Sequence, residues 1–229
     1  FSGYLTEAQL NELLNTQKKS NTLLGQVLIE KEFFTFEKYE EVLLQYRQES
    51  SLSADEIQAL KNNEVDKIAE IFLRTLPDEQ NKLIRDYFEL FIRNIIRFID
   101  DEIRIEAAKE VDSYPFDYLV TQKIDGAYRL FSGFAAAETV LARFASIYAE
   151  EEIGGMNELA KDALGEFLNC HNGLFLSHLS HKGIETDLFP GEVKEKGNLK
   201  PVAKTYVIPC YLSFGKIDFI FAGEFPDFV

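Results

Sequence analysis

Near residue 113 the spacing of apolar residues changes from a helical to an alternating pattern. Tyr118, Val120 and Gln122 alternate with Leu119, Thr121 and Lys123, which is the two-residue period of a strand. Asp125-Gly126 follows, and Asp-Gly between two such runs is a strong hairpin signal. We therefore predict strands at about 117–124 and 127–133.

Two helices are expected after this hairpin. The first covers about 135–150, and the second covers 157–181, after a break at Gly154-Gly155. Gly173 lies inside the second helix, where glycine costs about 1 kcal/mol relative to alanine, so we expect close backbone packing there. Lys182-Gly183 is a typical helix end.

Three more strands are predicted near 184–189, 203–213 and 217–223. Pro209 lies inside the second of them, which indicates an edge strand or a bulge because proline has no backbone N–H to donate. The order is strand, strand, helix, helix and three strands. This order predicts an α+β fold in which two helices cover one face of a largely antiparallel sheet.

Residues 51–112 show a helical pattern throughout and predict an all-helical region before the sheet. Ser53 and Glu56 form a capping box, and Pro77-Asp78 ends one helix and begins the next. The apolar surface of 78–109 is wider than one stripe, so we expect that helix to pack on two neighbours. Part of this surface is a candidate homodimer interface, and packing within the chain is the alternative.

The composition is that of a globular protein with reduced thiols. Of 229 residues, 46% are hydrophobic and 20 are phenylalanine, enough for packed cores. A net charge of −15 repels phosphate backbones, so we expect no nucleic-acid partner. No apolar run reaches the roughly 18 residues of a membrane helix and no signal-peptide pattern is present, so we expect no membrane insertion. Cys170 and Cys210 lack metal-binding spacing and predict a cytoplasmic protein.

Residues 1–50 contain a degenerate repeat. In each copy a threonine, Thr6 or Thr35, precedes a helical pattern, and Thr6 with Gln9 makes a capping box. The repeat resembles the MshEN domain, the N-terminal module of type II secretion and pilus ATPases, some members of which bind cyclic di-GMP. The first copy lacks the Leu-Gly start of that family, and Glu32 stands where a glycine is expected. We therefore favour a helical interaction module over a cyclic di-GMP site.

Three polar residues fall on one face of the predicted helix 157–181. At about 100° per residue, Asp162, Glu166 and Asn169 form a narrow stripe, and an apolar stripe that includes Leu164 and Phe167 lies opposite. We call these three residues the polar ridge. The pattern alone also fits an ordinary solvated helix face.

The polar ridge carries a recognisable motif. Asp, three residues, Glu, two residues, Asn, and a proline some twenty residues on (here Pro190) resemble the signature of the CheC/CheX/FliY family of chemotaxis phosphatases. The predicted order of elements over 113–229 is that of the CheX-like domain, and a single motif copy fits CheX better than CheC. The chain is thus divided into an MshEN-like module (1–50), a helical connector (51–112) and a CheX-like domain (113–229).

The resemblance implies a reaction and a role for each motif residue. The family removes the phosphoryl group from the aspartate of a response-regulator receiver domain, and the receiver supplies that aspartate, a bound Mg²⁺ and a lysine. Asn169 would orient the attacking water, and Glu166 would contact the receiver's lysine. Asp162 and Pro190 match the motif and would support the site. No cofactor is expected on this chain.

Two other functions stay open. The domain could dock a receiver without hydrolysis, or it could respond to a second messenger through residues 1–50. A metal enzyme is disfavoured because no cysteine or carboxylate cluster accompanies the three histidines (His171, His178 and His181), which we expect to be satisfied or partly exposed. The sequence contains no P-loop and no GxGxxG motif.

Overall fold

A computed structural model describes residues 33–35, 37–38, 64, 67, 78–101 and 103–229. The chain divides into two compact units, 1–57 and 58–229, and the helices and strands named below belong to the second. Most of the repeat in 1–50, and 51–77 apart from residues 64 and 67, lie outside the described residues, so the MshEN-like module stays a prediction. Within the repeat one helix start is described, where the backbone N–H of Lys38 donates to the Thr35 hydroxyl over 3.2 Å.

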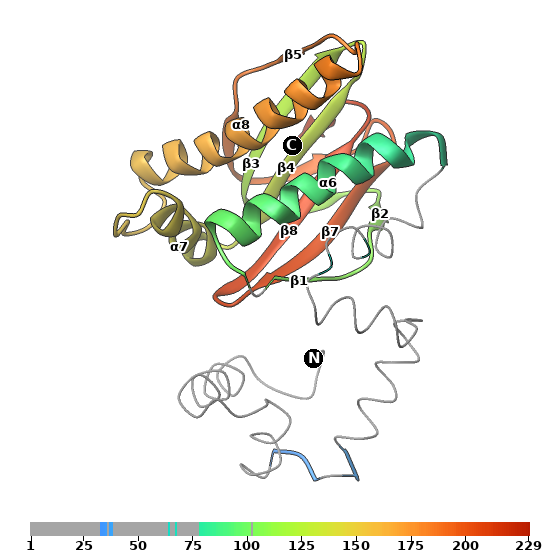
Figure 1. Cartoon of the computed structure of the whole chain (residues 1–229). Coiled ribbons are helices and arrows are strands. Elements are labelled where there is room, and N and C mark those ends of the chain that lie inside the picture. The colour runs from blue at the N-terminus through green and yellow to red at the C-terminus, as the bar shows by residue number, and fades with distance from the viewer. Residues whose placement is uncertain (1–32, 36, 39–63, 65–66, 68–77, 102) are drawn as a thin grey trace. The chain divides into compact units, whose positions relative to one another are not determined.

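The described strands form a single sheet in which every pair is antiparallel. They are β1 (Arg104–Ile105), β2 (Lys109–Val111), β3 (Tyr114–Gly126), β4 (Leu130–Ala136), β5 (Thr186–Leu188), β6 (Glu192–Lys200), β7 (Thr205–Leu212), β8 (Gly215–Ala222) and β9 (Asp227–Phe228). The main path is β1-β7-β8-β4-β3-β6-β9, with β2 beside β7 and β5 beside β3 (Figure 1). The predicted α+β class with a largely antiparallel sheet is confirmed.

Among the described residues, three helices accompany this sheet: α6 (Asp78–Phe98), α7 (Glu138–Tyr148) and α8 (Glu158–His181). Figure 1 shows α6 and α8 lying over the same face of the sheet. Aromatic rings fill the space between these layers. The ring of Phe91 on α6 lies 4.2 Å from Phe219 on β8, 6.2 Å from Phe167 on α8 and 6.5 Å from Phe134 on β4. Helix α6 is therefore part of the core of the sheet domain.

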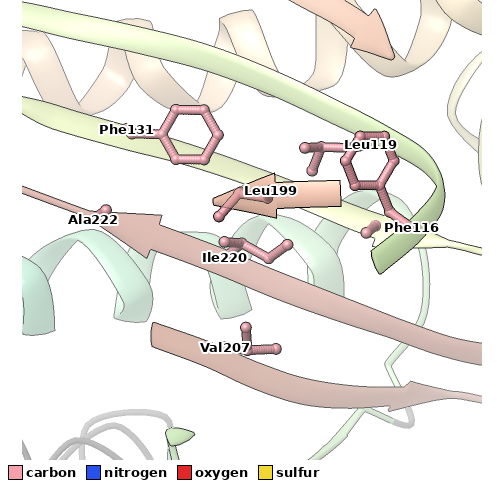
Figure 2. Close-up of a cluster of buried hydrophobic side chains, with 8 residues drawn as sticks. Phe116, Leu119, Phe131, Leu199, Val207, Ile220 and Ala222 are labelled. Carbon is pink, nitrogen blue, oxygen red and sulfur yellow. The ribbon is translucent and has the colours of Figure 1, made fainter. Parts of the chain in front are cut away.

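The opposite face of the sheet holds a second hydrophobic cluster, drawn in Figure 2. Its buried members come from β3, β4, β6, β7 and β8: Phe116, Leu119, Phe131, Ala135, Leu199, Val207, Ile220 and Ala222. Phe228 on the last strand closes the cluster, with its ring centroid 6.0 Å from that of Phe131. Burial on both faces explains why apolar and polar residues do not alternate along β4 (LFSGFAA).

One predicted helix boundary and several strands need correction. The helical pattern that extended to Lys109 ends at Phe98, and the segment after it forms β1 and β2. These short strands are stabilised by pairing with β7, more than ninety residues away, which local periodicity does not report. Strands β6 and β9 were also missed. Most side chains of β6 (EVKEKGNLK) are charged or polar, so it lacks the apolar signal of a strand.

Of the two alternatives predicted at Pro209, the edge strand is wrong and the bulge is confirmed. Strand β7 has neighbours on both sides, namely β8 and the pair β1 and β2. At Pro209 the register shifts by one residue, because Ile105 of β1 pairs with Cys210 and Lys109 of β2 pairs with Val207, so that residues 106–108 lie opposite 208–209. Its carbonyl accepts a hydrogen bond from the backbone N–H of Glu106 over 2.9 Å. The homodimer stays a prediction, and β7 offers no free edge for pairing with a second copy of the chain.

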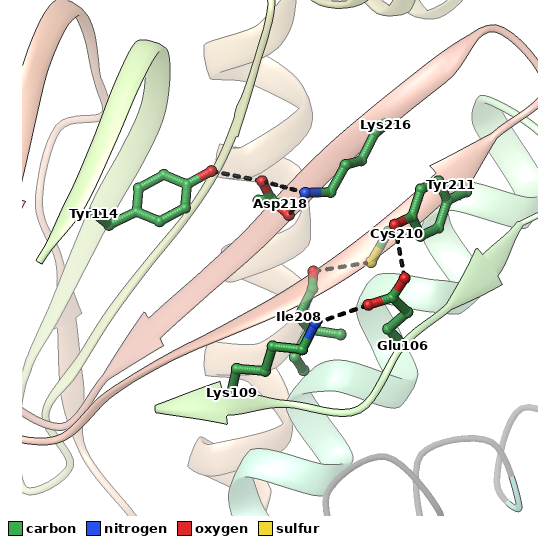
Figure 3. Close-up of polar contacts among 8 residues, drawn as sticks. All are labelled: Glu106, Lys109, Tyr114, Ile208, Cys210, Tyr211, Lys216 and Asp218. Carbon is green, nitrogen blue, oxygen red and sulfur yellow. Dashed lines mark hydrogen bonds and ion pairs between the residues drawn. The ribbon is translucent and has the colours of Figure 1, made fainter. Parts of the chain in front are cut away.

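Polar pairs link the segment between β1 and β2 to β7, and β3 to β8 (Figure 3). The hydroxyl of Tyr211 donates to the carboxylate of Glu106 over 2.7 Å, and the Glu106 carboxylate also accepts from Lys109 over 2.9 Å. On β3 the hydroxyl of Tyr114 donates to the carboxylate of Asp218 over 2.7 Å. These bonds hold the short strands in register with the long ones.

Candidate functional site

Helix α8 carries the polar ridge and is capped at both ends. At its start the side chain of Asn157 accepts the backbone N–H of Ala160 over 2.9 Å. At its end Gly183 adopts a φ of 74°, and the backbone N–H of Ile184 donates to the carbonyl of Leu179 over 3.0 Å. The predicted helix 157–181 and its Lys182-Gly183 end are confirmed. The caps hold the ridge on a regular helix.

The structure places all three ridge residues on the exposed side of α8. Asp162, Glu166 and Asn169 are exposed, whereas Leu164 and Phe167 are buried against the sheet. Among the described residues neither ridge carboxylate forms an ion pair. The nearby cation Lys161 binds Glu195 and Glu158 instead. The Glu166 carboxylate is thus free to bind a cation on another molecule.

Pro190 lies in the loop between β5 and β6 and is exposed. A buried glutamine on β3, Gln122, connects this loop to the polar ridge. Its side-chain N–H groups donate to the carbonyl oxygen of the Asn169 side chain over 3.1 Å and to the backbone carbonyl of Phe189 over 2.9 Å. The motif asparagine and the residue before the motif proline therefore share one hydrogen-bond donor.

Two further buried residues fix the side chain of Gln122 by hydrogen bonds. Its side-chain oxygen accepts from the Asn172 amide over 2.8 Å, and Asn172 in turn accepts from the hydroxyl of Tyr87 on α6 over 2.5 Å. Gln122, Asn172 and Tyr87 are all buried. Sequence reasoning missed all three. A usable signal for Gln122 existed, because it interrupts an apolar strand face formed by Val120 and Ile124.

The histidines on α8 occupy two different environments. His171 is fully buried, its Nδ1 lies 3.2 Å from the amide nitrogen of Asn94, and burial lowers its pKa to about 3. His178 is exposed and lies 3.1 Å from the carboxylate of Asp86 on α6. In the part of the chain that the structure describes, no group of three or more His, Cys, Asp or Glu residues could hold a metal ion.

The buried His171 predicts a loss of stability in mild acid. The unfolded histidine titrates near pH 6.5, so between pH 6.5 and about 3 the unfolded state binds more protons than the folded state. Stability that is present above pH 6.5 is therefore lost as the pH falls, by about 2 kcal/mol from pH 7 to 5. Urea unfolding at the two pH values should show this loss in the natural chain and a smaller loss in His171→Met. Equal losses in both would contradict it.

The close backbone packing expected at Gly173 is wrong. Apart from the backbone of its own helix, a Cβ built on Gly173 would meet no atom of the described residues within 4 Å. Gly173 is one helical turn beyond Asn169, on the side of α8 that carries the polar ridge. The glycine therefore does not serve packing within the described part of this chain.

Gly173→Ala is expected to raise the free energy of unfolding by about 0.5–1 kcal/mol, because alanine restricts the unfolded chain and fits the helix. Urea denaturation measures the change. The control is Gly133→Ala on β4, where a Cβ would lie 2.3 Å from the carbonyl oxygen of Val120 and should destabilise the protein. A destabilised Gly173→Ala would reveal a contact on this face of α8.

Solved structures of chemotaxis proteins have a similar fold. CheX from Desulfovibrio desulfuricans matches over 62% of this chain and 99% of its own, with a TM-score of 0.51 and 14% identity. A CheC-like superfamily protein from Shewanella sp. PV-4 matches over 62% and 97%, with a TM-score of 0.52 and 17% identity. The CheX–CheY–BeF3–Mg²⁺ complex from Borrelia burgdorferi matches over 61% and 95%, with a TM-score of 0.50 and 16% identity.

At these identities the likeness concerns the fold. It covers more of the chain than residues 113–229, which make up about half, so it takes in residues before 113. This agrees with the place of α6 in the core. No protein-family model matches the sequence, and no curated protein matches it either. Among the helices that the structure describes, none is both long enough and apolar enough to span a bilayer.

Proposed function

We propose that this protein hydrolyses the phospho-aspartate of a response-regulator receiver domain. The observation that carries the proposal is the pairing of an exposed, unpaired Glu166 carboxylate with the anchored amide of Asn169, three residues apart on one face of a capped helix. Because these side chains are exposed, a second protein can reach them with its active site. A solved complex of similar fold contains CheX bound to CheY, which supports a receiver as the partner.

The proposed reaction needs only one group from this chain, an amide that positions the attacking water. A water oxygen attacks phosphorus in line, the bond from phosphorus to the aspartate oxygen breaks, and the products are inorganic phosphate and a free aspartate carboxylate. The receiver supplies the aspartate, Mg²⁺ and lysine that stabilise the transferring group. The remaining requirement is a water held in the attacking position, and an amide can hold it by hydrogen bonding.

Each motif residue has a part in this proposal. The Asn169 amide orients the water. The Glu166 carboxylate binds the receiver's lysine and sets the depth at which the helix enters. Asp162 lies one turn before Glu166 on the same ridge and supports the site. Pro190 acts from the neighbouring loop.

The test is the decay of a phosphorylated receiver with and without the full chain. A catalytic amount of this protein should speed the loss of phosphate, and the rate should rise in proportion to its concentration. Binding of the receiver with unchanged decay would favour the docking module instead. If no receiver of the source genome binds and none loses phosphate faster, both hydrolysis and receiver docking are contradicted. A second-messenger response through residues 1–50 then remains.

A further inference from the structure

The orientation of every amide in the network around Gln122 follows from one backbone atom. The carbonyl oxygen of Phe189 can only accept a hydrogen bond, so the Gln122 atom that lies 2.9 Å from it must be the nitrogen. The Gln122 oxygen then faces Asn172, which must present its own nitrogen. The Asn172 oxygen is left to accept from Tyr87. The whole set is consistent in this arrangement and in no other.

The same reasoning fixes the amide of Asn169. Because the nitrogen of Gln122 faces Asn169, the Asn169 atom 3.1 Å away must be its oxygen. The Asn169 nitrogen, with two hydrogens to donate, and one remaining lone pair of the oxygen are therefore left for a ligand. An exposed asparagine without this bond would rotate among several rotamers and flip its amide.

Pro190 contributes to the same arrangement through its neighbour. A residue before proline is restricted to extended backbone, which limits where the Phe189 carbonyl can lie. The backbone N–H of Phe189 also donates to the carbonyl of Lys123 over 2.9 Å, so the loop is held against β3. The Phe189 carbonyl is thereby kept where it can accept from Gln122.

We infer that Gln122 is a positioning residue for the reaction, since it locks the Asn169 amide in the orientation that holds the attacking water. Pro190 assists it by placing the Phe189 carbonyl that orients Gln122. This inference rests on the proposed function. Gln122 touches neither water nor receiver, and its effect reaches the reaction through Asn169.

The first variant is Gln122→Met, which keeps the length of the side chain and removes its donors. The rate at saturating phosphorylated receiver should fall roughly tenfold, because the freed amide spends most of its time in unproductive rotamers. The KM for the receiver should stay unchanged, because Glu166 still binds. In an Asn169→Ala background Gln122→Met should have no further effect on the rate.

A matched control comes from the other face of the same strand. The buried hydroxyl of Thr121 donates to the carbonyl of Ser132 over 3.0 Å and has no part in the network. Thr121→Val should therefore leave the rate at saturation unchanged, even if it lowers stability. A second variant, Pro190→Ala, changes an exposed residue and avoids the risk that a core variant fails to fold. It should lower the same rate a few-fold with unchanged KM.

An NMR measurement reports the anchoring without any turnover. The side-chain ¹⁵NH₂ group of Asn169 should be ordered in the natural chain and mobile in Gln122→Met. A folded Gln122→Met with natural kcat, beside an inactive Asn169→Ala, would overturn the positioning role and leave the proposed function intact. A natural chain that does not speed phosphate loss would overturn both, even if the amide is ordered.

Discussion

Asn169→Ala is expected to remove most of the acceleration of phosphate loss, lowering the rate at saturating receiver roughly a hundredfold. The variant keeps the receiver's own aspartate, Mg²⁺ and lysine but lacks the amide that places the water. Misplacing a reacting group by about 1 Å costs a factor of this size. The measurement is the steady-state rate of phosphate loss at saturating phosphorylated receiver, with a catalytic amount of the variant.

Two comparisons make this result specific. The fold should be unaffected, because Asn169 is exposed and its loss leaves no cavity. The control Ser180→Ala, also exposed on α8, should keep the natural rate. Binding of the receiver to Asn169→Ala should persist through Glu166, so the loss should fall on kcat. A natural decay rate with Asn169→Ala would contradict the water-orienting role, and a loss of binding would assign the residue to docking.

Phe91→Ala is expected to lower the free energy of unfolding by about 3–5 kcal/mol, the range for a buried aromatic residue reduced to alanine. Phe91 is fully buried, and its ring packs on Phe134, Phe167 and Phe219 from two strands and α8. Removing it would open a cavity where α6 meets both the sheet and α8. Chemical denaturation of the full chain measures the change in the free energy of unfolding.

The matched control is Phe98→Ala at the end of the same helix. The Phe98 side chain is 37% exposed and makes an edge contact with Tyr148 at 6.2 Å between centroids, so its loss should cost less than about 1 kcal/mol. Equal effects of the two variants would mean that α6 is not part of the core. The comparison tests whether residues before 113 belong to the folding unit of the sheet.

Local signals were sufficient for α8 and its ridge. The start at Asn157, the end at Gly183 and the separation of polar from apolar positions all depend on residues within one or two turns. The hairpin of β3 and β4 was predicted for the same reason, although its loop is longer than a two-residue turn. The last paired residues are Ile124 and Leu130.

Other features had no local signal. Strand β6 carries few apolar residues and is a strand because it pairs with β3. The segment after α6 was predicted to be helical. Its short strands β1 and β2 form by pairing with β7, and this pairing leaves no signal in the local sequence. The glycine at 173 had a clear cost in the sequence but no packing reason in the fold.

By itself the sequence determined a capped amphipathic helix that carries Asp162, Glu166 and Asn169 on one face, because helix period and caps are short-range. Only the tertiary structure decided what holds the Asn169 amide. The bonds that Gln122 donates join residues 47 and 67 positions apart. Tyr87, which donates to the Gln122 partner Asn172, belongs to a helix that the sequence pattern placed outside the domain. A hydrogen bond between distant segments depends on how the backbone brings them together, and no local pattern reports it.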